Sequence, residues 1–183
     1  MTLKNFLKSK TFKCIIVLLV IALISGGLLA ILNDVLEVSS EERVQRTITK
    51  IYGKTIGYEE VEGVEFSNEN GSIVKVYKLE DNNILVQALG KFGYKNGSIT
   101  IWAVAKYKEN KFDCLSNIQV ASYVNQTLMS KFTDKELKKY DINGINDVSN
   151  YVISGATYSS NAMNNAVNCI MQYVSSLETK KEA

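Results

Sequence analysis

The chain of 183 residues contains no histidine. Without an imidazole it cannot form a His-dependent catalytic triad, a histidine general base or a zinc site that uses histidine. Its three cysteines are Cys14, Cys114 and Cys169, which are too few for a disulfide framework or a four-thiolate iron–sulfur site. Cys114 and Cys169 could pair in an oxidising compartment, but two buried free thiols are the preferred interpretation.

An excess of charge of either sign is also missing. Lys and Arg total 21 and Asp and Glu total 19, which gives a formal charge of +2. No basic run occurs beyond the extreme N-terminus and no nucleic-acid-binding motif is recognisable, so nucleic acid is not an expected partner. Glu59, Glu60 and Glu62 show no metal-ligand spacing, and we predict a solvated loop there and no metal site.

One long hydrophobic run occupies residues 14–32, with the sequence CIIVLLVIALISGGLLAIL. As a helix it spans about the ~30 Å of a bilayer's hydrocarbon core. Four lysines lie in the tail of residues 1–13 and acidic residues follow the run, a bias that predicts a cytoplasmic N-terminus and an extracytoplasmic domain. A cleaved signal peptide is the less favoured alternative, since the run exceeds the usual ~7–15-residue apolar region and lacks a clear cleavage pattern.

The rest of the chain predicts one α+β domain, with a connecting helix and loop over residues 33–70, a domain over 71–177 and a polar tail over 178–183. Ser39 to Glu42 forms a capping box before an amphipathic helix. Between Gly71 and Val124, four β-rich runs separated by turn residues predict an antiparallel meander. Their sequences are SIVKVYKL, NILVQALGKF, SITIWAVAKYK and CLSNIQVASYV. We expect Trp102, in the third run, to belong to the core.

Two further helices complete the predicted domain. Thr133 to Glu136 forms a second capping box, which opens a short helix. A longer helix is predicted from Ser159 or Ser160 onwards. The apolar residues at helical spacing form a face that can cover the sheet. These are Ala162, Met163, Ala166, Val167, Ile170, Met171 and Val174.

The segment Ser154-Gly155-Ala156-Thr157-Tyr158-Ser159-Ser160 precedes or opens that last helix. Gly155 and Ala156 allow the backbone to approach a ligand closely, and the hydroxyls and the unpaired N–H groups of a first helical turn suit a phosphate. An ordinary Ser-capped helix after a small-residue turn explains the same pattern. From the residues alone, both interpretations stand.

The order Ser154-Gly155-Ala156-Thr157, followed by hydroxyl residues and a helix, resembles the flavinylation motif of FMN-binding domains. It is most similar to the G subunit of Rnf complexes, a family related to the C subunit of sodium-translocating NADH:quinone reductases. There, a membrane helix precedes an extracytoplasmic domain whose motif threonine carries FMN through a phosphoester bond. The resemblance implies this role for Thr157, with Ser154, Gly155, Ala156, Ser159 and Ser160 around the cofactor.

Two other stretches extend the resemblance over most of the chain. Residues 93–99 are similar to the family's Gly-Tyr-x-Gly-x-Ile stretch, which makes Tyr94 a candidate for stacking on the flavin. Thr127 corresponds to a flavin-side threonine, although Gln126 replaces the family's acid before it. Tyr151 stands where the flavin transferase that modifies this family commonly expects an aspartate, so non-covalent FMN at the same helix terminus is the alternative to a phosphoester at Thr157.

The resemblance implies an electron-carrier subunit within an Rnf-type ferredoxin:NAD oxidoreductase, a translocase complex, rather than a complete enzyme. Its expected partners are the other membrane subunits of such a complex and the flavin transferase. Two alternatives stay open. One is a stand-alone extracytoplasmic FMN carrier for extracellular electron transfer, and the other is a flavin-free surface binding module on a membrane anchor.

Overall fold

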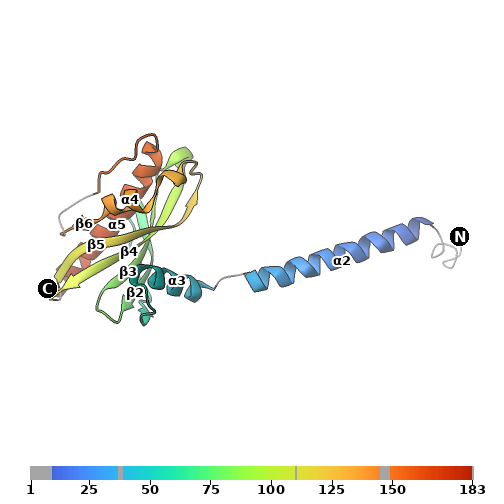
Figure 1. The fold of residues 1–183 in the computed structure, drawn as a ribbon, viewed down its shortest axis with the longest axis horizontal. Helices are drawn as coiled ribbons and strands as arrows, with labels where there is room; N and C mark the ends of the chain where they lie inside the picture. The colour runs from blue at the N-terminus through green and yellow to red at the C-terminus, as the bar shows by residue number, and fades with distance from the viewer. Residues whose placement is uncertain (1–9, 37–38, 110, 145–148, 183) are drawn as a thin grey trace. The chain divides into compact units, whose positions relative to one another are not determined.

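The structure is a computed structural model that describes residues 10–36, 39–109, 111–144 and 149–182. The chain divides into two parts, residues 1–46 and 47–183, which are treated separately below. In the first part, helix α2 (Lys10–Leu36) contains the predicted hydrophobic run (Figure 1). The window Phe12–Leu29 has a mean hydropathy of 2.6 and none of it is buried. By length and composition α2 can cross a membrane, a requirement that a signal sequence also meets.

Helix α3 (Ser40–Tyr52) begins at the predicted capping box. The Glu42 backbone N–H donates to Ser39 Oγ at 3.1 Å, and Gly53, with φ of +68°, follows the last helical residue. Val44 and Ile48, four residues apart, are both fully buried. This helix is therefore amphipathic, as its sequence predicts.

The second part contains a six-stranded sheet in which the spatial order follows the chain order. All neighbouring pairs are antiparallel. The strands are β1 (Tyr58–Glu60), β2 (Gly71–Leu79), β3 (Ile84–Gly90), β4 (Ser98–Lys108), β5 (Lys111–Val124) and β6 (Ile142–Asn143). The predicted meander is confirmed as β2 to β5. The short strands β1 and β6, which extend the sheet at its two edges, were not predicted.

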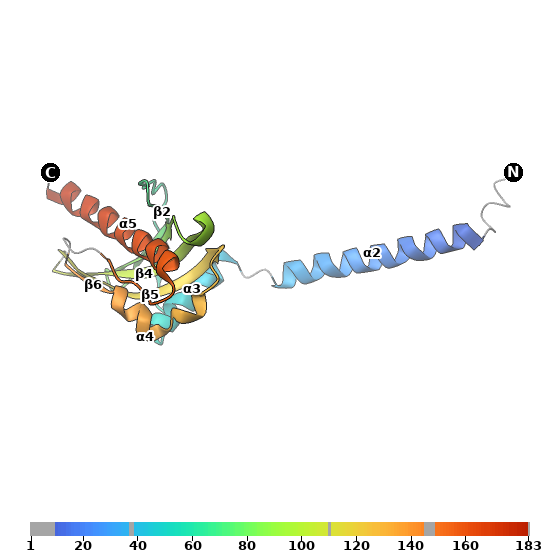
Figure 2. The same ribbon diagram turned by 90° about the horizontal axis from the view of Figure 1, so that it is seen from above.

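Helix α5 (Thr157–Glu182) covers one face of this sheet (Figure 2). All seven residues of its predicted apolar face are buried, and they share one core with Ile99, Ile101, Ala103 and Ala105 of β4. The helix lies so close to β3 that a Cβ placed on Gly90 would be 2.0 Å from the Ala162 carbonyl oxygen. Glycine at position 90 therefore sets how closely the start of α5 can approach the sheet.

The opposite face of the sheet has its own buried side chains. Trp102 and Val104 alternate with the residues beneath α5, and Trp102 is 7% exposed with its ring 6.0 Å from that of Tyr77. The predicted core position of Trp102 is confirmed. The second half of α3 lies on this side (Figure 2), where the Asn83 side-chain amide donates to the Tyr52 hydroxyl at 3.4 Å.

The chain between β5 and β6 is folded into short helical turns. These are η2 (Met129–Lys131), α4 (Asp134–Leu137) and η3 (Lys138–Tyr140). Thr133 caps α4 as predicted, accepting from the Glu136 backbone N–H at 3.4 Å. A domain with helices on an antiparallel sheet has the predicted α+β architecture. Cys114 on β5 and the buried Cys169 on α5 are free thiols.

Candidate functional site

A pocket of about 280 Å³ lies at the start of α5. It brings together the turn η1 (Tyr94–Asn96) between β3 and β4, the segment after β5, and the turn into α5. Its lining residues are Tyr94, Thr127, Leu128, Gly155, Ala156, Thr157, Tyr158 and Ser159. Six of the eight residues that the sequence assigned to the site thus line one pocket, while Ser154 and Ser160 do not.

The turn into α5 places Thr157 in the first helical turn. Gly155 has φ of +75°, a left-handed conformation that glycine adopts without strain. The Ala156 N–H donates to the Ile153 carbonyl at 2.9 Å, and the Ser160 N–H donates to the Ala156 carbonyl at 2.8 Å. The helix therefore begins at Thr157. The apolar periodicity had predicted a later start, at Ser159 or Ser160. Thr157 itself is exposed.

The two serines of this turn are buried and hydrogen-bonded within the protein. The Ser159 hydroxyl donates to Gln126 Oε1 at 2.7 Å, and the Ser160 hydroxyl accepts from the Ile153 N–H at 2.9 Å. Both side chains therefore stabilise the turn. Thr157 differs from them because its hydroxyl belongs to an exposed side chain in the pocket wall, so of these three side chains it is the one whose hydroxyl can reach a ligand.

Gln126 joins all three segments that form the pocket. It is 7% exposed, and its Oε1 accepts from the Tyr94 backbone N–H at 3.2 Å as well as from Ser159. Its Nε2 donates to the Val124 carbonyl at 3.0 Å. A neutral amide can donate and accept at once, so this side chain ties strand end, loop and helix start together. Sequence reasoning assigned Gln126 no such role.

Four asparagines of α5 hold the chain on both sides of the pocket. On one side, Asn161 and Asn165 donate to the carbonyls of Phe92 and Lys91 at 3.0 and 2.9 Å. On the other, Asn164 donates to the Tyr151 carbonyl at 3.0 Å, and Asn168 exchanges two hydrogen bonds with the Ser149 backbone at 2.7 and 3.1 Å. The sequence signal for these clamps is the recurrence of asparagine at spacings of three and four on one helix.

Two tyrosine rings stand at the mouth of the pocket. The rings of Tyr94 and Tyr158 are 6.4 Å apart between centroids and tilted by 59°. Their exposed fractions are 37% and 66%. Exposed aromatic faces beside a helix start suit a flat, conjugated ligand with an anionic end.

Tyr151, at the position where an aspartate was expected, is held by residues of the α4 region. Its hydroxyl donates to Glu136 and accepts from Lys139 Nζ at 2.8 Å. Lys139 Nζ also donates to the Glu136 carboxylate at 2.9 and 3.1 Å, and the hydrogen bond from Tyr151, followed by those from Lys139, lowers the pKa of Glu136. Tyr151 therefore holds the segment that precedes the turn into α5 against the α4 region. Asp147, the nearest upstream aspartate, lies outside the described residues.

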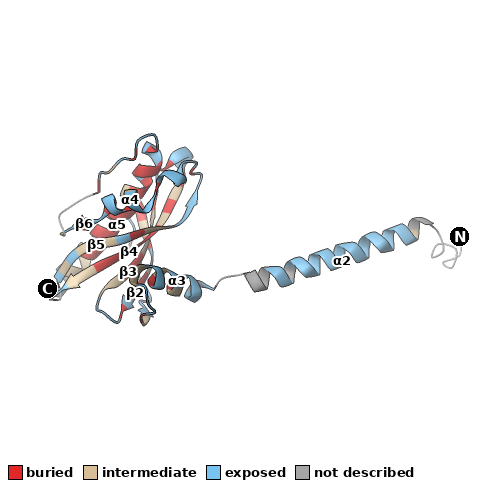
Figure 3. Ribbon diagram, viewed as in Figure 1, coloured by how far each residue is buried: buried red, intermediate tan, exposed pale blue. Residues whose placement is uncertain are grey.

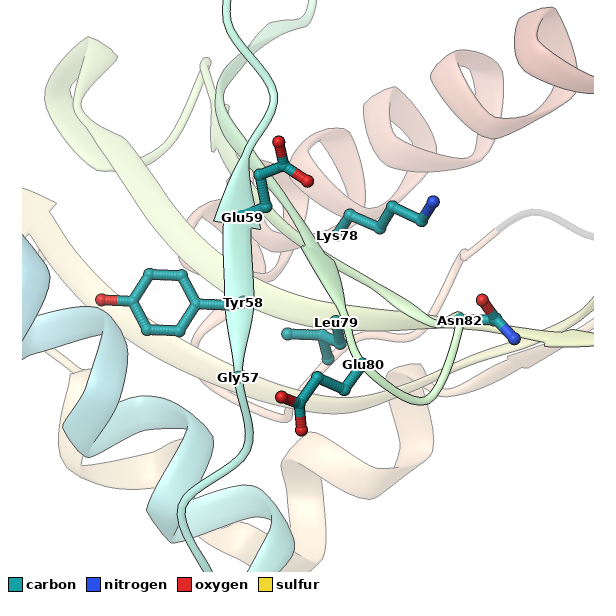
Figure 4. A pocket seen from close by; sticks show the side chains of 7 residues that line it. All are labelled: Gly57, Tyr58, Glu59, Lys78, Leu79, Glu80 and Asn82. Carbon is teal, nitrogen blue, oxygen red and sulfur yellow. The ribbon is translucent and has the colours of Figure 1, made fainter.

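A second pocket, of about 380 Å³, lies between β1 and β2 at the edge of the sheet (Figure 4). Its charged side chains are Glu59, Glu80 and Lys78. Two carboxylates against one ammonium disfavour a phosphate, and the pocket adjoins no helix start. This pocket therefore lacks the chemistry found at the start of α5.

Comparison with known proteins gives one match. A family model described as FMN-binding domain matches residues 47–172. The matched range contains every strand of the sheet, the pocket and the first part of α5. No curated protein and no solved structure matches the chain.

Proposed function

Because the chain belongs to the FMN-binding domain family, we propose that it holds FMN in the pocket at the start of α5 and serves as an electron carrier in an Rnf-type membrane complex. The observation that supports this most directly is the convergence of Tyr94, Thr127 and Thr157, from three separate segments, on one pocket. The family match supports FMN as the cofactor. The complex and the linkage are proposals.

The residues present fit the two ends of FMN. At one end, the N–H groups of the first turn of α5 and the exposed Thr157 suit a phosphate. At the other, the exposed rings of Tyr94 and Tyr158 suit the isoalloxazine system. Thr157 and the first turn of α5 would thus hold the phosphate end of FMN, and the rings of Tyr94 and Tyr158 would hold its conjugated ring system.

FMN, when bound, supplies the chemistry of accepting and releasing electrons. The protein's task is to hold it in place. Gln126 and the four asparagines of α5 fix the three segments of the pocket against each other. No side chain of the pocket needs to transfer a proton for this role.

We further propose that FMN is attached to Thr157 by a phosphoester bond. A flavin transferase would join Thr157 Oγ1 to the flavin phosphorus of a dinucleotide donor, while the bond to the second nucleotide breaks and the hydroxyl proton leaves. Thr157 is suited to this because it is exposed, whereas Ser159 and Ser160 are buried and hydrogen-bonded. Non-covalent FMN in the same pocket is the alternative.

The linkage is tested by denaturing gel electrophoresis of protein from cells that contain the transferase. We expect a fluorescent flavin band in the wild type and in Ser154→Ala, and none in Thr157→Ala. Intact-mass analysis should show the added mass of one FMN residue. A colourless wild-type band with flavin released on denaturation would support the non-covalent alternative, and protein that neither contains nor binds flavin would contradict the function as a whole.

For the location, we propose that α2 anchors the protein with the N-terminus in the cytoplasm and the FMN-binding domain outside. The apolar window of α2 supports the anchor, and the lysines before it support the orientation. Protease added to intact spheroplasts should digest the domain. Cross-linking followed by purification should recover other membrane redox subunits, whereas recovery of the chain alone, still loaded with flavin, would favour a stand-alone carrier.

A further inference from the structure

Lys131, which ends η2, reaches across to the turn into α5. Its ammonium donates to the Ser154 carbonyl oxygen at 2.9 Å. A Cβ placed on Gly155 would lie 2.5 Å from the same Nζ. The ammonium is therefore in direct contact with the turn whose next residues, Ala156 and Thr157, line the pocket.

Gly155 serves two purposes in this arrangement. Its φ of +75° is a conformation that other residues rarely adopt. The missing side chain also leaves the space that the Lys131 ammonium occupies. The backbone angle is therefore one reason for glycine at position 155, and the room it leaves for the Lys131 ammonium is another.

Lys131 is not among the residues that line the pocket, but its charge lies beside the turn that forms one wall and favours an anion there. An ammonium has three N–H donors, and the Ser154 carbonyl takes one of them. Lys131 is exposed, so the other donors can reach a ligand. Helix α5 has 26 residues, and the partial positive charge of its N-terminus lies beside the same turn. Two separate sources of positive potential thus lie beside the turn from Ser154 to Thr157.

We propose that Lys131 recognises the phosphate of FMN, by a charge-assisted hydrogen bond from its ammonium to a phosphate oxygen. This inference rests on the proposed function, since it names a further residue of the same site. The Ser154 carbonyl holds the ammonium in place before the ligand arrives, which reduces the conformational entropy lost on binding.

The test compares two ligands that differ only in the phosphate. Flavin-free full-length protein, produced in cells without the transferase and kept in detergent, is titrated with FMN and with riboflavin by flavin fluorescence. We expect Lys131→Met to raise the Kd for FMN about tenfold or more and to leave the Kd for riboflavin unchanged. Lys131→Arg should restore most of the FMN affinity, and Lys54→Met, at an exposed lysine in the loop after α3, should change neither.

A second measurement does not depend on riboflavin binding. If Lys131 pairs with phosphate, the FMN affinity of the wild type falls more steeply with salt than that of Lys131→Met. Equal FMN affinities, or an equal loss for both ligands, would overturn the role of Lys131 while leaving the site intact. A wild type that binds FMN no better than an unrelated membrane protein does would overturn the site itself. Thermal unfolding of each variant separates loss of binding from loss of fold.

Discussion

The two long helices of this protein place their apolar side chains in different surroundings. Helix α2 has 27 residues and α5 has 26. The apolar side chains of α2 are exposed around its whole circumference, whereas those of α5 are buried on one face against the sheet (Figure 3). In α5, apolar residues recur at spacings of three and four, while in α2 they are continuous. The two helices therefore differ both in apolar content and in periodicity. Helix α5 has one apolar face that packs on the sheet, whereas α2 has an uninterrupted apolar run that by length and composition can cross a membrane.

We expect the largest difference between the two helices when an aspartate is introduced into each of them and the free energy of unfolding is compared. Ile170 of α5 is fully buried, and Leu23 of α2 is 67% exposed. We expect Ile170→Asp to lower the free energy of unfolding of the domain by more than about 4 kcal/mol, because an unpaired carboxylate would lie in the core. Leu23→Asp should leave it unchanged and weaken membrane retention instead. Urea unfolding in detergent, followed by the fluorescence of Trp102, measures the first effect and membrane fractionation the second. Equal unfolding midpoints would show that α5 does not form the core.

The addition of one methyl group tests how closely α5 packs on the sheet. Gly90→Ala would bring a carbon within 2.0 Å of the Ala162 carbonyl oxygen, so the start of α5 must shift. We expect a loss of about 2–3 kcal/mol in unfolding free energy and weaker retention of flavin. Gly27→Ala is the matched control, since nothing lies within 4 Å of its added Cβ, and it should leave the unfolding midpoint unchanged. Unaltered stability and flavin content in Gly90→Ala would contradict the close contact between α5 and β3.

The asparagine side chains of α5 donate to backbone carbonyls of neighbouring segments, which the described side chains of α2 do not. Removing one of them should therefore loosen only the segment that it holds. Removing one hydrogen bond costs about 1 kcal/mol; Asn161→Ala removes one, and Asn164→Ala removes two because Asn164 Oδ1 also accepts from the Ser149 hydroxyl at 2.7 Å. Asn164→Ala should speed amide exchange near Tyr151, and Asn161→Ala should speed it near Phe92, because each side chain holds the carbonyl of its own segment. Hydrogen exchange followed by mass spectrometry tests this. Faster exchange in both segments after either substitution would show that the clamps act together.

The last prediction concerns pH. Burial raises the pKa of the Cys169 thiol to about 11 and that of the Tyr140 phenol to about 12. Above pH 9 the unfolded chain loses protons that the folded domain keeps, so the free energy of unfolding falls as pH rises from 9 towards 12. Urea midpoints across this range should decline, and Cys169→Ala should flatten the part between pH 9 and 11. A midpoint that is constant from pH 8 to 11 would contradict the burial of this thiol.

Much of the fold follows from short-range pattern. Strands β2 to β5 have alternating or continuous apolar runs bounded by turn residues, so their positions are predictable within a few residues. Strands β1 and β6 have only three and two residues, which is too short for any period to be seen. The predicted start of α5, at Ser159 or Ser160, is two or three residues late because the first-turn residues Thr157 and Tyr158 are exposed and give no apolar signal.

The candidate site is predictable only in part for a related reason. The turn from Ser154 to Thr157 is continuous in sequence and chemically distinctive. Lys131, in contrast, contacts this turn from 23 residues away, and Gln126 contacts Ser159, in the first turn of α5, from 33 residues away. Nothing in local composition marks a single glutamine or lysine as the residue that returns to a helix start. Only the way β5 leads back beside α5 brings these side chains to the pocket.

The chain order of the sheet also governs how the protein is made. All the strands among the described residues precede α5 in the sequence, so the face that α5 covers is synthesised first and stays in contact with water until the helix follows. Neighbouring strands can pair as they emerge, but the face closes only when α5 docks. Thr157 takes its final position at that last step, so the pocket at the start of α5 is complete only when the domain is.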